Sequence, residues 1–410
     1  MIIKEYIKRF EKLGLGMFVH FGLYSVHGKG EWAHGRNISV EEYEKLFYKF
    51  NPEKDWAEKL VETAKKAGCK YITLTTRHHD GFSLFDTLGL TDYDAPHSAA
   101  GRDLVREFVN ACRAEDIIPF FYHTLLDWHE KSYKENFKEY LKYLRRSIEI
   151  LCTEYGKIGG LWFDGMWDKW DEDWEEDALY GTIRKYQPEA MIINNTGLSK
   201  LGELGHIELD SVTFERGKPS PINLESSPKY IASEMCEVFA NHWGYASRDF
   251  NFKSLATIIE EFCVCRRYGA NMLMNVGPMG NGYLRPLDKA MLESLGEWIE
   301  IHKEALYLPR PSGIEIEGKE KDFILRLGDN TYYLFAHGIP MSADDNVELR
   351  LNNPEALDKF SLGKKVRSAV WLDSGEQVDR FIDGEQIIFC PKNQLYGEQL
   401  VVKIAKIITE

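Results

Sequence analysis

Short apolar segments alternate with amphipathic segments over the first three quarters of the chain, and this alternation constrains the fold more than any other feature. A strand followed by a helix, repeated many times, is typical of a parallel sheet. Eight such strands within roughly 300 residues predict a (β/α)8-like barrel of the TIM type. The predicted strands are 16–20, 71–75, 117–122, 160–163, 191–194, 210–214, 231–235 and 271–276. The predicted helices include 56–64, 104–112, 135–155, 253–268 and 289–306.

The pattern changes after Ser312, where short strands separated by turn signals take over. Asp329 and Asn330 lie between two of them and are typical of a hairpin turn. About 100 residues of this kind predict a small antiparallel β-sandwich. With Pro309 and Pro311 as a linker, we expect a barrel domain over 1–309 and a C-terminal sandwich over 310–410. The predicted strands are 323–327, 331–335, 347–351, 386–389 and 400–404.

Charge and composition exclude several classes of partner. The net charge of −14 argues against nucleic acid, which needs a basic surface, and against anionic membranes. No stretch approaches the roughly 18 apolar residues of a membrane-spanning helix. The N-terminal segment MIIKEYIKRFEKLG is typical of an amphipathic helix and lacks the apolar core of a signal peptide. The seven cysteines are scattered and odd in number, which indicates free thiols in a reducing compartment. We therefore expect a cytoplasmic protein.

Ionisable and aromatic residues gather where the first four predicted strands end, and in a (β/α)-barrel the chemistry lies at these ends. Asp164 ends an apolar strand directly before Gly165, which lets a ligand approach the carboxylate closely. Such a carboxylate suits acetal cleavage as a nucleophile, although it would also suit the cap of the next helix. The four strand ends carry His20, then 77–82 (RHHDGF), then Tyr122 and His123, then 162–165 (WFDG).

Two further sets of residues leave alternatives open. His78 and His79, joined by His20, would suit zinc as neutral imidazoles, but histidines also donate hydrogen bonds to sugar hydroxyls. The chain has neither an H-x-H nor an H-E-x-x-H spacing there, so we expect no metal. Trp167 and Trp170 lie in an acidic segment after strand four. Aromatic planes stack on the apolar faces of sugar rings, so both are candidates for contact with a sugar substrate.

Five motifs follow one another along the barrel segment: HFGLYSV at 20–26 with Glu31-Trp32, HHDGF at 78–82, GRD at 101–103, LWFDG at 161–165, and GANMLMNVGP at 269–278. Together they resemble glycoside hydrolase family 29, the α-L-fucosidases, over about 14–305. The chain departs from the family pattern at Phe21, where a Trp is common. It also departs at Asn194-Asn195-Thr196, where some members read N-D-R.

The resemblance implies a retaining double displacement on terminal α-L-fucose, without metal or other cofactor. The substrate would be a fucosylated oligosaccharide or glycoconjugate. Asp164 falls on the position of the family's nucleophile. The sequence does not decide between a monomer and a homo-oligomer. The positions that resemble the family's fucose-binding residues are His20, Glu31, Trp32, His78, His79, Tyr122 and Trp162.

The general acid/base has two candidates. Glu215 ends the segment DSVTFE, which resembles a "D-x-x-T-x-E" segment in which many members of the family carry this group. Glu234 lies before 242–245 (HWGY) in a stretch that resembles a "W-E-x-C … S-W-G-Y" segment of the family, with Ser233 in place of the usual Trp. We favour Glu215. The acid must hold a proton before the first step, so its surroundings should raise its pKa toward neutral. A retaining pair of carboxyl groups should lie about 5–5.5 Å apart.

Three other functions compete with that of a fucosidase. A non-catalytic fucose-binding protein would need the pocket but not the carboxylates, and Asp164, Glu215 and Glu234 are all present. A metal-dependent barrel hydrolase would use the three histidines. A glycosidase for a related sugar is the third, because β-D-galactose shares much of the hydroxyl stereochemistry of α-L-fucose.

Overall fold

Eight parallel strands form a closed barrel in the computed structural model, which describes residues 2–196, 202–222, 224, 227–342, 357–383, 386–390 and 393–410. The strands follow one another around the barrel in chain order, and β8 pairs with β1. The predicted (β/α)8-type barrel is thus confirmed. Its strands are β1 (Leu15–Val19), β2 (Tyr71–Arg77), β3 (Ile118–Thr124), β4 (Gly160–Asp164), β5 (Met191–Asn194), β6 (Ser211–Glu215), β7 (Ala232–Val238) and β8 (Asn271–Val276).

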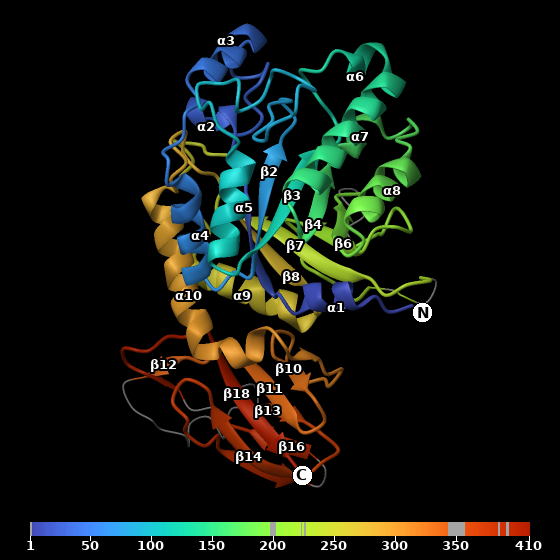
Figure 1. Cartoon of the computed structure of the whole chain (residues 1–410). Coiled ribbons are helices and arrows are strands. Elements are labelled where there is room, and N and C mark those ends of the chain that lie inside the picture. Colours follow the sequence, from blue (N-terminus) through green and yellow to red (C-terminus); the bar gives the residue numbers. More distant parts are fainter. Residues whose placement is uncertain are drawn as a thin grey trace. The chain divides into compact units, whose positions relative to one another are not determined.

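Amphipathic helices cover the outside of these strands (Figure 1). In α5 (Leu104–Ala114) the apolar residues recur at helical spacing and face inward, and the Asp103 side chain caps the helix by accepting from Arg106 N. Short helices lie in the loops that follow the strands: α2 (Leu23–His27), α3 (Val40–Glu44), η1 (Lys45–Tyr48), α6 (Ser132–Glu135) and η2 (Met166–Lys169). The longer helices are α4 (Trp56–Lys66), α5 (Leu104–Ala114), α7 (Phe137–Glu154) and α8 (Glu176–Tyr186).

Helix α1 (Glu5–Glu11) closes the N-terminal end of the barrel. Its Phe10 packs edge-on against Tyr71, at 5.6 Å between ring centroids, and its carbonyl accepts from Asn271 Nδ2. Tyr71 fills the barrel beside Gly16, where an added Cβ would lie only 2.4 Å from the Tyr71 ring. With this end filled by side chains, the opposite end of the strands is left for a site.

The chain divides into two compact units, Met1–Lys253 with Ala270–Glu293 and Ser254–Gly269 with Ser294–Glu410. Helix α9 (Leu255–Arg267) belongs to the second unit, and α10 (Pro286–Leu306) is shared between the two. The domain boundary expected after residue 309 stays a prediction.

The C-terminal part of the second unit is a β-sandwich, as predicted. A five-stranded sheet runs in the order β14-β18-β11-β10-β9 and a three-stranded sheet in the order β13-β16-β15. Apolar side chains of both sheets share one core, which includes Leu334, Phe389 and Ile407. The strands are β9 (Arg310–Pro311), β10 (Phe323–Leu327), β11 (Thr331–His337), β12 (Met341–Ser342), β13 (Asp358–Phe360), β14 (Val366–Trp371), β15 (Arg380–Asp383), β16 (Gln386–Phe389), β17 (Gln394–Leu395) and β18 (Val402–Thr409).

The hairpin turn expected at Asp329 and Asn330 joins β10 to β11, as predicted. The expected linker differs from the prediction, because Pro311 pairs with Leu325 in the edge strand β9. An edge strand tolerates proline because its outer N–H positions need no partner. The strand predicted at 347–351 lies outside the described residues. None of the described helices combines the length and the apolar character that a membrane crossing requires.

Candidate active site

A cavity of about 180 Å³ lies where the barrel strands end at their C-terminal side. It is lined mainly by rings, with a few polar groups among them, which is the usual make-up of a small-molecule site. Eight of the ten predicted site residues line it, and Glu31 and Glu234 do not. The lining residues are Phe18, His20, Trp32, His78, His79, Tyr122, Trp162, Asp164, Trp167, Asn195, Glu215, Cys236 and Trp243.

Two adjacent histidines reach the cavity because β2 ends just before them. The pairing of β2 with β3 shifts register between Thr75 and Arg77, an irregularity that re-aims the residues that follow. His78 and His79 therefore both line the cavity, although neighbours in a regular strand face opposite ways. The His78 ring stacks on Tyr122, with 5.6 Å between centroids and 16° between planes.

The hydrogen bonds of His79 fix which of its ring nitrogens carries the proton. Thr124 Oγ1 donates its one hydrogen to the Leu126 carbonyl at 2.7 Å, so it must accept from His79 Nδ1 at 2.8 Å. Burial lowers the pKa of His79 to about 3, which keeps the ring neutral. Its Nε2 is then a free acceptor in the cavity, 3.5 Å from Asp164 Oδ2, and suits the hydroxyl hydrogen of a ligand.

His20 is held in the same tautomer by different partners. Asn275 Nδ2 donates to the Trp243 carbonyl at 2.7 Å, so its Oδ1 accepts from His20 Nδ1 at 2.6 Å. Burial lowers the pKa of His20 to about 3, and the neutral ring presents Nε2 as an acceptor. Among the described residues, no three His, Cys, Asp or Glu side chains are grouped in a way that would hold a metal ion.

Asp164 is the last residue of β4 and receives hydrogen bonds at both oxygens. Tyr122 Oη donates to Oδ2 at 3.2 Å, and Asn195 Nδ2 donates to Oδ1 at 3.3 Å. Burial raises the pKa of Asp164, and these donors partly offset that rise. Gly165 turns the chain away with φ 98°, where an added Cβ would lie 3.0 Å from Leu126. The carboxylate is therefore held in place while one side of it stays open.

Glu215 is the last residue of β6 and shares a hydrogen-bond donor with Asp164. Asn195 Nδ2 donates to Glu215 Oε2 at 2.5 Å as well as to Asp164 Oδ1. Burial, and after it the charge of Asp164, raises the pKa of Glu215 to about 7. Glu215 therefore holds its proton at neutral pH more readily than an ordinary glutamate, as a general acid requires.

Glu234 lies one layer deeper in the barrel than Glu215. The register of β6 with β7 sets Glu215 level with Cys236, whereas Glu234 is level with Thr213. Both Glu234 oxygens are engaged inside the barrel, one by Tyr71 Oη and the other by Trp162 Nε1 at 3.0 Å. Burial raises the pKa of Glu234 to about 7, but its carboxyl group does not line the cavity.

Aromatic rings form one wall at the rim of the cavity. The Trp32 ring stacks on Trp167, with 5.8 Å between ring centroids, and contacts Trp128, with 5.3 Å between centroids. The Arg36 guanidinium lies 4.2 Å from the Trp32 ring centroid. Of the two tryptophans left open by the sequence, Trp167 lines the cavity, whereas Trp170 does not and is 82% exposed.

Glu31 does not line the cavity but supports the loop that carries Trp243. Its buried carboxylate accepts from the backbone N–H groups of Trp243 at 3.1 Å and Gly244 at 2.8 Å. These bonds hold the loop after β7 against the segment after β1, and the loop brings the Trp243 ring to the cavity. Substrate binding by Glu31 itself stays a prediction.

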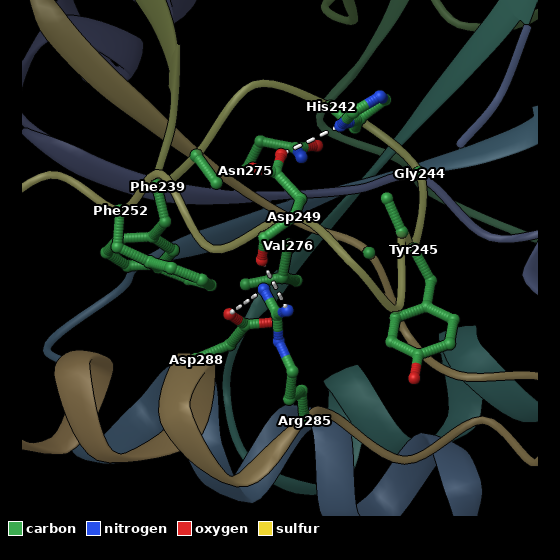
Figure 2. Close-up of a pocket in the computed structure, with 13 residues that line it drawn as sticks. Phe239, His242, Gly244, Tyr245, Asp249, Phe252, Asn275, Val276, Arg285 and Asp288 are labelled. Atoms are coloured by element: carbon green, nitrogen blue, oxygen red, sulfur yellow. Dashed lines mark hydrogen bonds and ion pairs between the residues drawn. The ribbon is translucent and has the colours of Figure 1, made fainter. Parts of the chain in front are cut away.

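A second, smaller hollow of about 30 Å³ lies behind this loop and has room for about one water molecule (Figure 2). Asp249 Oδ2 accepts from His242 Nδ1 at 2.7 Å, and the Asp249 carbonyl accepts from Arg285 Nη1 at 3.1 Å. Arg285 also pairs with Asp288. These contacts hold the loop that carries Trp243 against the N-terminal end of α10. The residues around the hollow therefore help to position the site.

Sequence reasoning missed four lining residues: Phe18, Asn195, Cys236 and Trp243. Phe18 and Cys236 read as strand core. Trp243 lies in a loop without periodicity, where its one signal is the resemblance of 242–245 to "S-W-G-Y". Asn195 had a signal, because it follows predicted strand five and lies where the chain departs from the pattern "N-D-R".

Known proteins resemble this chain over most of its length. The family model described as alpha-L-fucosidase matches residues 3–304. Tissue alpha-L-fucosidase of Bos taurus is 27% identical over 343 residues, which cover 75% of this chain and 70% of the bovine protein. The human tissue enzyme is 25% identical and covers 80% of this chain, with 75% of its own length matched.

Solved structures share the fold over nearly the whole chain. Alpha-L-fucosidase isoenzyme 1 from Paenibacillus thiaminolyticus superposes with a TM-score of 0.81 at 27% identity and covers 99% of both chains. A GH29 fucosidase from Bacteroides thetaiotaomicron, trapped as a covalent intermediate with 2-fluoro-fucosyl fluoride, has a TM-score of 0.80 at 23% identity, covering 99% of this chain and 96% of its own. The family model spans most of the chain, and both the sequence and the fold match those of known fucosidases: this chain belongs to the α-L-fucosidase family of glycoside hydrolases.

Proposed function

We propose that the protein removes terminal α-L-fucosyl residues from oligosaccharides or glycoconjugates by a retaining double displacement, with Asp164 as nucleophile and Glu215 as acid/base. One observation carries this proposal: a single nitrogen, Asn195 Nδ2, hydrogen-bonds to both carboxyl groups. Asp164 Oδ1 and Glu215 Oε2 therefore lie at most about 6 Å apart, which fits the roughly 5–5.5 Å of retaining pairs better than the roughly 6.5–9.5 Å of inverting pairs.

In the first step, Asp164 attacks the anomeric carbon while Glu215 gives its proton to the glycosidic oxygen. The carbon–oxygen bond to the leaving group breaks, and a β-fucosyl ester of Asp164 forms. In the second step, Glu215, now a carboxylate, takes a proton from water. The resulting hydroxide-like oxygen attacks the same carbon and releases Asp164, giving α-L-fucose. The neutral His20 and His79 rings supply acceptors for sugar hydroxyls.

The protonation states set a bell-shaped pH profile for kcat/KM. Asp164 must be ionised, so activity rises as pH increases through its raised pKa. Glu215 must be protonated, so activity falls as pH increases through about 7. We expect a maximum between these limits, with apparent pKa values that belong to the interacting pair. Rates on an aryl α-L-fucoside from pH 4 to 9, with return to the optimum pH as a stability control, measure the profile. A rate that does not fall above pH 7 would contradict it.

The stereochemistry of the first product tests the proposal directly. Proton NMR spectra recorded early in the hydrolysis of an aryl α-L-fucoside should show α-L-fucose as the first product, before mutarotation forms the β-anomer. Release of β-L-fucose first would mean inversion and would rule out Asp164 as a covalent nucleophile. Faster hydrolysis of an aryl β-D-galactoside would favour the related-sugar alternative. Fucose binding without any hydrolysis would favour the non-catalytic one.

For the location of the protein we propose a reducing compartment, the cytoplasm. None of the seven cysteines, all of which are buried, forms a disulfide, as expected for a chain that folds in such a compartment.

A further inference from the structure

Asn195 lies between the two proposed catalytic carboxyl groups and is buried. Its Nδ2 donates to Asp164 Oδ1 at 3.3 Å and to Glu215 Oε2 at 2.5 Å. An amide nitrogen carries two hydrogens, so one side chain serves both acceptors at once. This link spans three neighbouring strands, because Asp164 ends β4, Asn195 follows β5 and Glu215 ends β6.

Thr213 fixes the direction of this amide. Its Oγ1 donates to Asn195 Oδ1 at 3.1 Å, and it lies two residues before Glu215 on the same face of β6. A flipped amide would turn its oxygen toward two carboxyl groups. The observed orientation is therefore the one that satisfies all three partners, Asp164, Glu215 and Thr213.

We propose that Asn195 is a positioning residue, which uses one amide nitrogen to hold the nucleophile Asp164 and the acid/base Glu215 at the spacing of the retaining reaction, with Thr213 setting the direction of the amide. This inference rests on the proposed function, because it assigns the two carboxyl groups their roles. It also gives a physical meaning to the departure of the chain from the pattern "N-D-R", where an aspartate would replace the donor by an acceptor.

The same link affects how the two acids titrate. A hydrogen bond to a carboxylate favours its charged form, so Asn195 opposes the rise that burial causes in the pKa of Asp164 and of Glu215. The other groups that face these two acids are His79, Tyr122, Trp167 and the backbone of Gly165 at Asp164, and Arg216, Glu237 and Asp164 at Glu215.

The test compares Asn195→Asp and Asn195→Ala with the parent protein. We expect kcat to fall about 10- to 100-fold with a much smaller change in KM, because misplacement by about 1 Å costs about 100-fold in rate. The alkaline limb of the kcat/KM profile should move to higher pH, and furthest in Asn195→Asp, which adds a like charge. Thr213→Val should also move the alkaline limb of the kcat/KM profile to higher pH. Thr213→Ser, which keeps the hydroxyl, should keep that limb at its position in the parent.

Asn194→Ser is the matched control. Asn194 precedes Asn195, but its Nδ2 donates to Tyr180 of α8, away from the cavity. This variant should keep the kcat/KM pH profile of the parent, even if its melting temperature falls. If the Asn195 variants had a higher KM and weaker inhibition by fucose than the parent, but the same kcat/KM pH profile, Asn195 would be a substrate ligand. If only their melting temperature fell, Asn195 would be a packing residue. Either result would overturn the proposal.

A second measurement needs no activity. Carboxyl ¹³C NMR of the free protein, assigned with Glu215→Gln and Asp164→Asn, follows the titration of both acids. Asn195→Ala should move both midpoints to higher pH, and unmoved midpoints would overturn the link. A parent that fails to hydrolyse fucosides while showing this shift would refute the proposed function and not the link.

Discussion

Replacing Asp164 with glycine is expected to lower kcat/KM for an aryl α-L-fucoside by roughly 10⁴- to 10⁶-fold, the scale seen when a covalent nucleophile is removed. Within the described part of the chain, Asp164 and Glu215 are the only carboxyl groups that line the cavity. Glu215 holds the proton for the leaving group, so it cannot also serve as nucleophile. Initial rates over a range of substrate concentrations measure the loss.

Azide should restore turnover in Asp164→Gly, because the shortened side chain leaves space where the carboxylate stood. A small anion there attacks the face of the sugar that Asp164 would attack, so the product should be β-fucosyl azide, identified by NMR. Asp171→Gly is the control: Asp171 is exposed and lies in the segment after β4, and this variant removes the same charge without touching the cavity. An active Asp164→Gly, or an α-fucosyl azide product, would refute the nucleophile.

The barrel could be predicted because its elements are encoded locally. The β-branched run at 71–75 and the helical spacing of Leu104, Phe108 and Cys112 need no distant partner to be recognised. The strand ends then place His20, His78 and Asp164 at one rim by topology alone. Observed bounds differ by a few residues, as at β2, which continues to Arg77.

Local sequence patterns could not predict the layer of the barrel in which a side chain lies. Glu215 and Glu234 both lie in apolar strands, and only the register of β6 with β7 shows that one is at the rim and the other a layer below. The support of the site depends on contacts far apart in the chain. Glu31 binds the backbone of Trp243 and Gly244, more than 200 positions away, and no periodic pattern marks that loop.

Glu215→Gln is expected to lower kcat/KM by about 10²- to 10⁴-fold on substrates with poor leaving groups, the usual contribution of general acid catalysis. The loss should shrink sharply with dinitrophenyl fucoside or fucosyl fluoride, because these leaving groups depart without a proton. Loss of the base should then slow the second step and lower kcat. Azide, which needs no base, should relieve that step and give α-fucosyl azide, the anomer opposite to that expected from Asp164→Gly.

Glu234→Gln separates the two glutamates because its defect should not depend on the leaving group. The Glu234 carboxyl accepts from both Tyr71 Oη and Trp162 Nε1, and a glutamine would turn one N–H group toward a donor. A buried mismatch of this kind costs about 1–3 kcal/mol, so the variant should melt earlier while poor and good leaving groups lose activity equally. The opposite pattern, with leaving-group dependence in Glu234→Gln and none in Glu215→Gln, would transfer the acid/base role to Glu234. It would also require that carboxyl to leave the barrel core for the cavity during the reaction.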